Sequence, residues 1–214
     1  MRPVEIKCPV KGTWMFMNPP GHHPDAKDFV AVDNSGKPYK LFRLLPHLLF
    51  KLNVKNTYAF SQSVFAPFNG VIVKLEKNIT DRQSLNLIRD CIVGLLVAPR
   101  KHKNNPEYFL GNHLIIKSDD GTYALLAHLK KGSIVFEEGM RVEAGEQIAE
   151  VGNSGNTIQS HLHFQLMSDN DPFSSIPLPF VINTFELKKQ SGWEKEHLSL
   201  PGNFKVFRTY ENPL

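Results

Sequence analysis

The sequence predicts a mainly β protein, built as an antiparallel sheet or sandwich that carries one small inserted helix. Short runs rich in β-branched and aromatic residues recur between Gly, Asn and Asp turns from residue 64 onward. Hydrophobic residues make up 41% of the 214 residues and charged residues 21%, which are ordinary values for a globular chain. We therefore expect residues 1–214 to fold as a single domain with a sizeable core.

The expected strands become more regular along the chain. Before residue 60 the extended pieces are short and are interrupted by Pro and Gly, at residues 15–17, 29–32 and 40–43. From residue 64 the runs are longer, and turn residues bound them on both sides. These later strands are expected at residues 64–67, 70–76, 112–117, 122–129, 147–151 and 161–167.

Residues 78–108 break the β pattern and are interpreted as a helical insertion. A helix could begin at Thr80 or Asp81, both of which are favoured capping residues. The apolar residues that would then share one helical face are Leu85, Ile88, Ile92 and Leu95. Residues 172–214 form a C-terminal extension that begins Pro-rich and contains two strand-like pieces, at 180–187 and 204–210.

Charge and apolar patterning exclude two classes of partner. The net charge of +4 and pI near 9.0 suit an anionic polymer such as cell wall, but no Lys/Arg cluster forms a nucleic-acid footprint. No window approaches the ~18 apolar residues of a membrane span, and the first residues lack the apolar region of a signal peptide. Cys8 and Cys91 have no zinc-type spacing. Neither the compartment nor the oligomeric state follows from these features.

The strongest chemical signal is the pair His161 and His163 in a strand-like setting. Residues i and i+2 of a strand point to the same side, so two imidazoles converge on one face. Neutral imidazole is a favoured zinc ligand, and a hydrolytic zinc site needs about three protein ligands and an open position. From this motif alone, a pair of surface histidines explains the spacing equally well.

Two further patches supply matching chemistry. His128 ends an apolar strand, where a lone histidine is more often a satisfied core or edge residue. His22, His23 and Asp28 precede another strand, and alone they would be read as part of a polar turn. Together with the histidine pair they provide nitrogen and oxygen ligands and spare imidazoles, which a metal-dependent hydrolase requires. His113 could line the same cleft, but it is interpreted as a sheet histidine whose polar atoms are satisfied.

Five stretches of this chain resemble the lysostaphin-type zinc endopeptidases, and they occur in that family's order within residues 22–167, the expected peptidase core. They are APFNGVIV at 66–73, AHL at 127–129, GMRVEAGEQIA at 139–149, VGNSGNT at 151–157 and HLHF at 161–164. The resemblance implies an antiparallel, barrel-sandwich-hybrid-like metallopeptidase core and a Zn²⁺ cofactor.

The resemblance also implies roles for individual residues. Asp28 and His163 match two of the family's metal ligands, and the third would be one of His22 and His23. His128 and His161 match its two catalytic histidines, which do not bind metal. The family's His-x-x-x-Asp spacing is longer here, since Asp28 follows His23 by five residues and His22 by six. An even separation slightly favours His22 if the segment is extended, whereas a bend at Pro24 favours His23.

The function implied is a zinc-dependent endopeptidase that cleaves peptidoglycan cross-links of the Gly-Gly or D-amino-acid type, in the cell envelope. One alternative is a catalytically inactive family member that uses the same groove for binding. Another is a carrier-like binding module, because the hairpin around Gly145 also resembles biotinyl and lipoyl carriers and the sugar-transport phosphocarrier fold. The carrier alternative lacks a Met-Lys-Met or Asp-Lys modification site.

Overall fold

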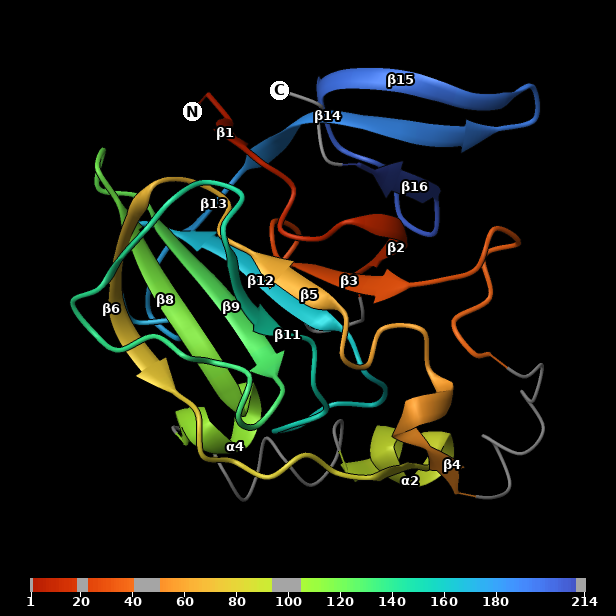
Figure 1. The fold of residues 1–214 in the computed structure, drawn as a ribbon, viewed down its shortest axis with the longest axis horizontal. Coiled ribbons are helices and arrows are strands. Elements are labelled where there is room, and N and C mark those ends of the chain that lie inside the picture. Colours follow the sequence, from red (N-terminus) through yellow and green to blue (C-terminus); the bar gives the residue numbers. More distant parts are fainter. Residues whose placement is uncertain (1, 19–22, 41–50, 94–104, 211–214) are drawn as a thin grey trace.

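The structure is a computed structural model, and it describes residues 2–18, 23–40, 51–93 and 105–210. Within these ranges the chain is mainly β, with two short helices and one 3₁₀ turn (Figure 1). This confirms the fold class expected from the sequence. No helix in the described ranges is long and apolar enough to cross a membrane.

The strands lie close to where the turn pattern places them. The helices are α2 (Leu87–Ile92) and α4 (Pro106–Leu110), and the 3₁₀ turn is Val54–Asn56. The strands are β1 (Val4–Ile6), β2 (Gly12–Met17), β3 (Lys27–Ala31), β4 (Leu52–Asn53), β5 (Ser63–Phe65), β6 (Gly70–Glu76), β7 (Ser84–Leu85), β8 (Asn112–Ser118), β9 (Tyr123–Leu129), β10 (Arg141–Val142), β11 (Gln147–Glu150), β12 (Leu162–Met167), β13 (Pro177–Leu178), β14 (Phe180–Lys189), β15 (Gly192–Ser199) and β16 (Val206–Thr209).

One large sheet organises the described part of the chain. Its strand order is β1-β14-β16-β2-β3-β12-β9-β8-β6-β10, with β13 beside β12 and β15 beside β14. All of these pairs are antiparallel except β1 with β14, so the sheet is mixed at one edge rather than wholly antiparallel. The C-terminal extension belongs to this sheet, because β14 and β16 connect β1 to β2 (Figure 1).

The main hydrophobic core lies on one face of the large sheet. Strands β5 and β11 pair separately and contribute Val64, Ile148 and Ala149 to this core. Aromatic rings tie the central strands together edge to face, with centroids 4.6 Å apart for Phe16 and Phe29 and 5.0 Å apart for Phe164 and Phe180. The alternation of side chains along β3 and β12 then directs their polar residues to the opposite face.

That opposite face, which we call the site face, carries a smaller apolar cluster. Ile115, Leu125, Ala127 and Met167 are buried there, and Leu110 of α4 packs against them. Helix α4 begins at Pro106, after Asn105 accepts a hydrogen bond from the Tyr108 amide as N-cap. The insertion therefore helps to cover the floor of the face on which the candidate site lies.

The helix expected inside the insertion is shorter and differently placed than the sequence periodicity suggests. Leu85 belongs to β7 and is opposite Leu52 of β4, so it takes no part in a helical face. Helix α2 is capped by Asn86 rather than by Thr80 or Asp81, and Ile88 and Ile92 are 47% and 50% exposed. The remaining member of the expected face, Leu95, lies outside the described residues.

The early and late extended pieces are largely confirmed. Residues 15–17 lie in β2, 29–31 in β3, and the two C-terminal pieces become β14 and β16. Lys40 is not in a strand, and the rest of the piece expected at 40–43 lies outside the described residues. Strand β15 was not expected, because its sequence GWEKEHLS is polar and has no apolar alternation; its register is set by the neighbouring β14.

Candidate metal centre and active site

Strand register brings Asp28 and His163 together, although 135 residues separate them. Asp28 on β3 is directly opposite His163 on β12, and His163 is opposite Ala127 on β9. Directly opposed residues of antiparallel strands share a face, so Asp28 and His163 lie on the site face with Ala127. The carboxylate is 4% exposed.

The contacts around Asp28 form a compact acid–imidazole cluster. His163 Nδ1 is 2.8 Å from Asp28 Oδ1, and His161 Nε2 is 3.6 Å from the same oxygen. The His128 ring lies 4.7 Å from the His161 ring and 6.1 Å from the His163 ring, measured between centroids. The structure thus brings together four of the six residues expected to form the site.

His128 sits on a β-bulge. Between β8 and β9 the register changes from Asn112 opposite Leu129 to Leu114 opposite Leu126, so Ala127 and His128 together oppose His113. The φ angle of His128 is +62°, in the left-handed region that few non-glycine residues adopt and in which Asn, Asp and His are enriched. The bulge turns the imidazole toward the other two histidines, which strict alternation along β9 would not do.

Main-chain carbonyls set the tautomers of the two candidate catalytic histidines. His128 Nδ1 lies 2.9 Å from the carbonyl oxygen of Ser154, and His161 Nδ1 lies 2.7 Å from that of Gln159. A carbonyl only accepts, so Nδ1 carries the proton in both rings and Nε2 presents a lone pair. His161 Nε2 is buried and has no hydrogen-bond partner among the described residues.

Burial lowers the pKa of His128 well below 6.5, and the adjacent His161 and His163 lower it further. The Asp28 carboxylate and the hydrogen bond to Ser154 oppose this shift without overcoming it. His128 is therefore neutral near neutral pH, in the form that can accept a proton.

Of the two candidates for the first metal ligand, only His23 lies within the described residues. His22 lies outside them. The His23 side chain is 48% exposed, and its Nδ1 accepts a hydrogen bond from the Asp25 amide at 3.2 Å. The ion pair of the His23 ring within the described ranges is with Asp25, at 3.7 Å. The choice between His22 and His23 stays a prediction.

The donor set of the cluster fits a zinc ion. A carboxylate oxygen and an imidazole nitrogen converge at Asp28 and His163, and the lone pair of His161 Nε2 is buried beside them without a partner. Zinc prefers such nitrogen and oxygen ligands. The described residues alone do not contain three side chains placed to hold a metal, so the site needs a further ligand.

Two loops that contact each other closely support the Ser154 carbonyl. A Cβ added at Gly111 would lie 2.4 Å from the main-chain carbon of Ser154, and one added at Gly155 would lie 2.4 Å from the Gly111 nitrogen. Both glycines have positive φ, +61° and +76°. The Asn112 amide also donates to Ser154 Oγ at 2.9 Å. Only glycine allows these two turns to touch.

Gly111→Ala is expected to destabilise the protein by at least about 2 kcal/mol, because the new methyl group would clash with the main chain of Ser154. Gly121→Ala is the matched control, since its φ is also positive, +90°, but nothing lies within 4 Å of the added Cβ. The control should lose only about 1–2 kcal/mol from left-handed strain. Denaturant unfolding of both variants measures the difference, and equal losses would show that the loop contact is unimportant.

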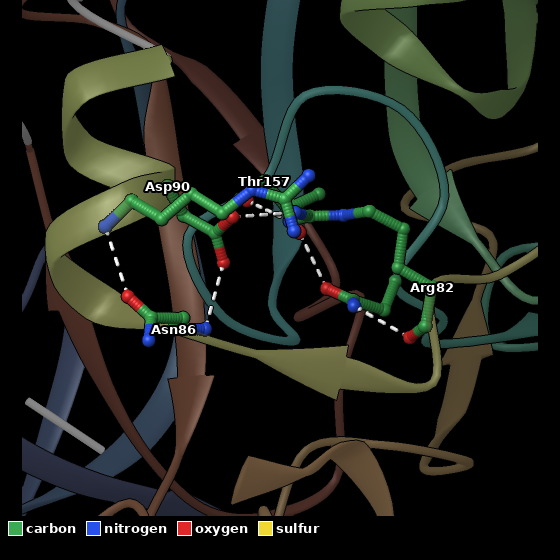
Figure 2. Close-up of polar contacts among 6 residues, drawn as sticks. Arg82, Asn86, Asp90 and Thr157 are labelled. Carbon is green, nitrogen blue, oxygen red and sulfur yellow. Dashed lines mark hydrogen bonds and ion pairs between the residues drawn. The ribbon is translucent and has the colours of Figure 1, made fainter. Parts of the chain in front are cut away.

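A polar network joins helix α2 to the loop that contains Ser154 (Figure 2). Arg82 Nη1 is 2.7 Å from Asp90 Oδ1, and Arg82 Nη2 donates to the carbonyl oxygen and the hydroxyl of Thr157. Asp90 is 4% exposed and also accepts from the Asn86 amide at 3.0 Å. Asn153, next to Ser154, donates its side-chain amide to the Arg82 carbonyl at 2.8 Å. Sequence reasoning missed this network, because its members are neither spaced as a motif nor close in sequence.

Arg82→Met is expected to lower stability by about 1–3 kcal/mol, less than for a fully buried pair because the Arg82 side chain is 37% exposed. It should also lower kcat more than it raises KM, since the loop that orients His128 loses a support. Arg89→Met, on the exposed side of α2, is the matched control and should change neither quantity. An Arg82 variant with reduced stability but unchanged kcat would rule out a positioning role.

Part of the chain is similar to a known peptidase family. Residues 94–175 match peptidase family M23, a segment that contains His128, His161 and His163. The match confirms the resemblance to the lysostaphin-type peptidases. Asp28 lies outside the matched segment and reaches the histidines only through the pairing of β3 with β12.

Individual relatives are distant. A peptidoglycan DD-endopeptidase of Vibrio cholerae, ShyB, is 30% identical over 83 residues, which cover 39% of this chain and 18% of that protein. The catalytic domain of the prophage-encoded M23 protein EnpA from Enterococcus faecalis is similar in structure, with a TM-score of 0.44, 15% identity and coverage of 76% of this chain and 87% of that one. Lysostaphin from Staphylococcus simulans has a TM-score of 0.44, 17% identity and coverage of 77% and 47%.

Proposed function

We propose that this protein is a zinc-dependent endopeptidase that hydrolyses peptide cross-links of peptidoglycan. The observation that carries the proposal is the Asp28–His163 contact of 2.8 Å with His161 and His128 gathered around it. The match to peptidase family M23 supports a metallo-endopeptidase. The cell envelope is the compartment in which such a substrate occurs.

The proposed metal ligands are Asp28, His163 and one of His22 and His23. A bound zinc ion supplies Lewis acidity toward the scissile carbonyl and makes water acidic enough to act as a nucleophile near neutral pH. In this protein His163 Nδ1 lies 2.8 Å from Asp28 Oδ1, and His163 would hold a cation through Nδ1 only after giving up the proton on that atom.

His128 and His161 are the proposed proton carriers. Their Nδ1 protons are held by carbonyl oxygens, so each ring offers Nε2 to the reacting atoms. One Nε2 would accept the proton of the attacking water, and the imidazolium so formed can stabilise the oxyanion. The same proton is then delivered to the leaving amine, directly or through the other ring. Burial excludes bulk water, which strengthens these interactions.

The alternatives expected from the sequence are less favoured. A phosphocarrier module needs only paired histidines and no acidic residue beside them, whereas Asp28 is buried and hydrogen-bonded to His163. An inactive binding protein has no need for two histidines whose tautomers are fixed by main-chain carbonyls. The bond that is cut, Gly-Gly or one involving a D-amino acid, depends on contacts that the cluster itself does not define.

The test is zinc analysis of the purified chain combined with a hydrolysis assay on peptidoglycan and on pentaglycine. We expect about one zinc per chain, as in a mononuclear hydrolase, and cleavage that a chelator stops and added zinc restores. Pentaglycine cleavage would identify a Gly-Gly bond, and cleavage of peptidoglycan alone would favour a D-amino-acid cross-link. A zinc-loaded protein that cleaves neither would contradict the proposal.

A further inference from the structure

His113 lies on the site face, in the same cross-strand row of residues as Asp28 and His163. It is opposite Ala127 and His128 on β9, and it is opposite Glu76 on β6. The row that starts with Asp28 and His163 therefore continues through the bulge to His113 and Glu76. At about 4.8 Å per strand, His113 is roughly 10 Å from His163 along this row, a distance that about three residues of an extended peptide span.

The His113 ring has a fixed tautomer and an unused acceptor. Its Nδ1 is 2.8 Å from the carbonyl oxygen of Gly111, so Nδ1 donates and Nε2 carries the lone pair. The residue is 2% exposed, and Nε2 has no hydrogen-bond partner among the described residues. Burial lowers its pKa below 6.5, which keeps the ring neutral. The interpretation of His113 as a satisfied sheet histidine therefore holds for Nδ1 but not for Nε2. A buried acceptor without a donor is costly.

A cavity of about 540 Å³ adjoins this ring, and acidic side chains dominate its wall. Glu76 comes from β6, Glu107 from α4 and Glu138 from the loop before β10. Lys74 is the only cationic residue among the described lining residues, which leaves a formal charge of −2 from three carboxylates and one ammonium. Glu76 and Glu107 are close enough to act electrostatically on His113.

The chemistry of this wall selects its ligand. Three carboxylates and one imidazole lone pair are all acceptors, so the complementary group is a cation that only donates hydrogen bonds. The described residues here do not form a metal site. The acceptors come from separate elements rather than from one plane, which suits the three rotatable N–H bonds of an ammonium better than the flat fork of a guanidinium.

We propose that His113, Glu76, Glu107 and Glu138 form a subsite for a primary ammonium group of a peptide ligand. Its link to catalysis rests on the proposed function, because the subsite would hold an amine-bearing residue of the cross-link about three residues from the cleaved bond. The binding itself does not require hydrolysis. The subsite also accounts for a histidine that is buried in an unfavourable state.

The binding test uses two small probes, Nα-acetyl-lysine amide and Nα-acetyl-norleucine amide, which differ by the ammonium group. Titration of the ¹⁵N-labelled full chain is followed through the His113 ring nitrogens and through calorimetry. We expect the lysine probe to bind and to shift the His113 Nε2 signal, and the norleucine probe to do neither. Equal binding of the two probes, or of Nα-acetyl-arginine amide and the lysine probe, would overturn the ammonium assignment, as would lysine binding without a His113 response.

Three variants are expected to weaken, strengthen and leave unchanged the affinity for the lysine probe. This pattern separates the subsite from a general loss of structure. Glu107→Gln should weaken lysine binding about tenfold, the loss expected when an ammonium–carboxylate hydrogen bond becomes an ammonium–amide one. Lys74→Met should strengthen it, because a competing cation leaves the wall. Glu137→Gln removes a nearby carboxylate outside the cavity, which pairs with Lys77, and should leave affinity unchanged. A uniform effect of all three would contradict the proposal.

A separate readout distinguishes failure of the subsite from failure of the proposed function. If the protein cleaves no peptide, lysine-probe binding at His113 still supports the subsite as a binding site. If it cleaves, substrates with a free amine should have a higher kcat/KM than acetylated ones, and Glu107→Gln should reduce this preference. Active cleavage with no amine preference and no lysine-probe binding would overturn the subsite while leaving the peptidase intact.

Discussion

His163→Ala is expected to abolish zinc binding and with it hydrolysis. His163 Nδ1 lies 2.8 Å from Asp28 Oδ1, and the two side chains are only 12% and 6% exposed. Loss of one of about three protein ligands removes much of the affinity of a zinc site, and the buried carboxylate loses its hydrogen-bond partner. Zinc content after dialysis and the hydrolysis rate should therefore fall together, to background.

His197→Ala is the control for this prediction. His197 is exposed on β15, where its Nδ1 lies 3.1 Å from the hydroxyl of Thr184. It should keep its zinc and its activity. Asp28→Asn should resemble His163→Ala, since the amide keeps the size of the carboxylate but not its charge. Normal zinc content in the His163 variant would show that the metal site lies elsewhere.

The sequence indicates which side chains form the candidate site, but not the backbone features that orient them. The His-x-His spacing on a strand places two imidazoles on one side by simple alternation, and the motif order adds Asp28. The bulge at His128 has no such signal, because its cause is a register shift between β8 and β9 that involves Asn112 and Leu114. The Ser154 and Gln159 carbonyls that fix the tautomers are main-chain groups, which no side-chain pattern reports.

Non-local pairing also explains the errors in the fold. Leu85 fits a 3.6-residue period with Ile88 and Ile92, but pairing with Leu52 of β4 makes it a strand residue. Once Asn86 caps the helix, the two isoleucines turn outward. Likewise the parallel β1–β14 pair joins residues near opposite ends of the chain. Such pairings depend on the whole sheet, whereas periodicity describes only neighbours.

His128→Ala is expected to leave zinc content near normal and to reduce kcat by about 10²–10⁴, the usual contribution of a general acid or base. Its Nδ1 bonds to the Ser154 carbonyl rather than to the acid–imidazole pair, so its removal does not take away a proposed ligand. His161→Ala should behave in the same way, because its Nδ1 bonds to the Gln159 carbonyl.

The bulge supplies a sharper version of this experiment. At φ +62° asparagine is better tolerated than alanine, so His128→Asn removes the imidazole with the least backbone strain. If His128 carries a proton, the Asn and Ala variants should lose kcat equally, although the Asn variant should be more stable to denaturant. If His128 only maintains the bulge, the Asn variant should recover activity along with stability. Equal loss of zinc in the His128 and His163 variants would instead show that both residues bind the metal. This result would contradict the assignment of His128 as a proton carrier that does not bind zinc.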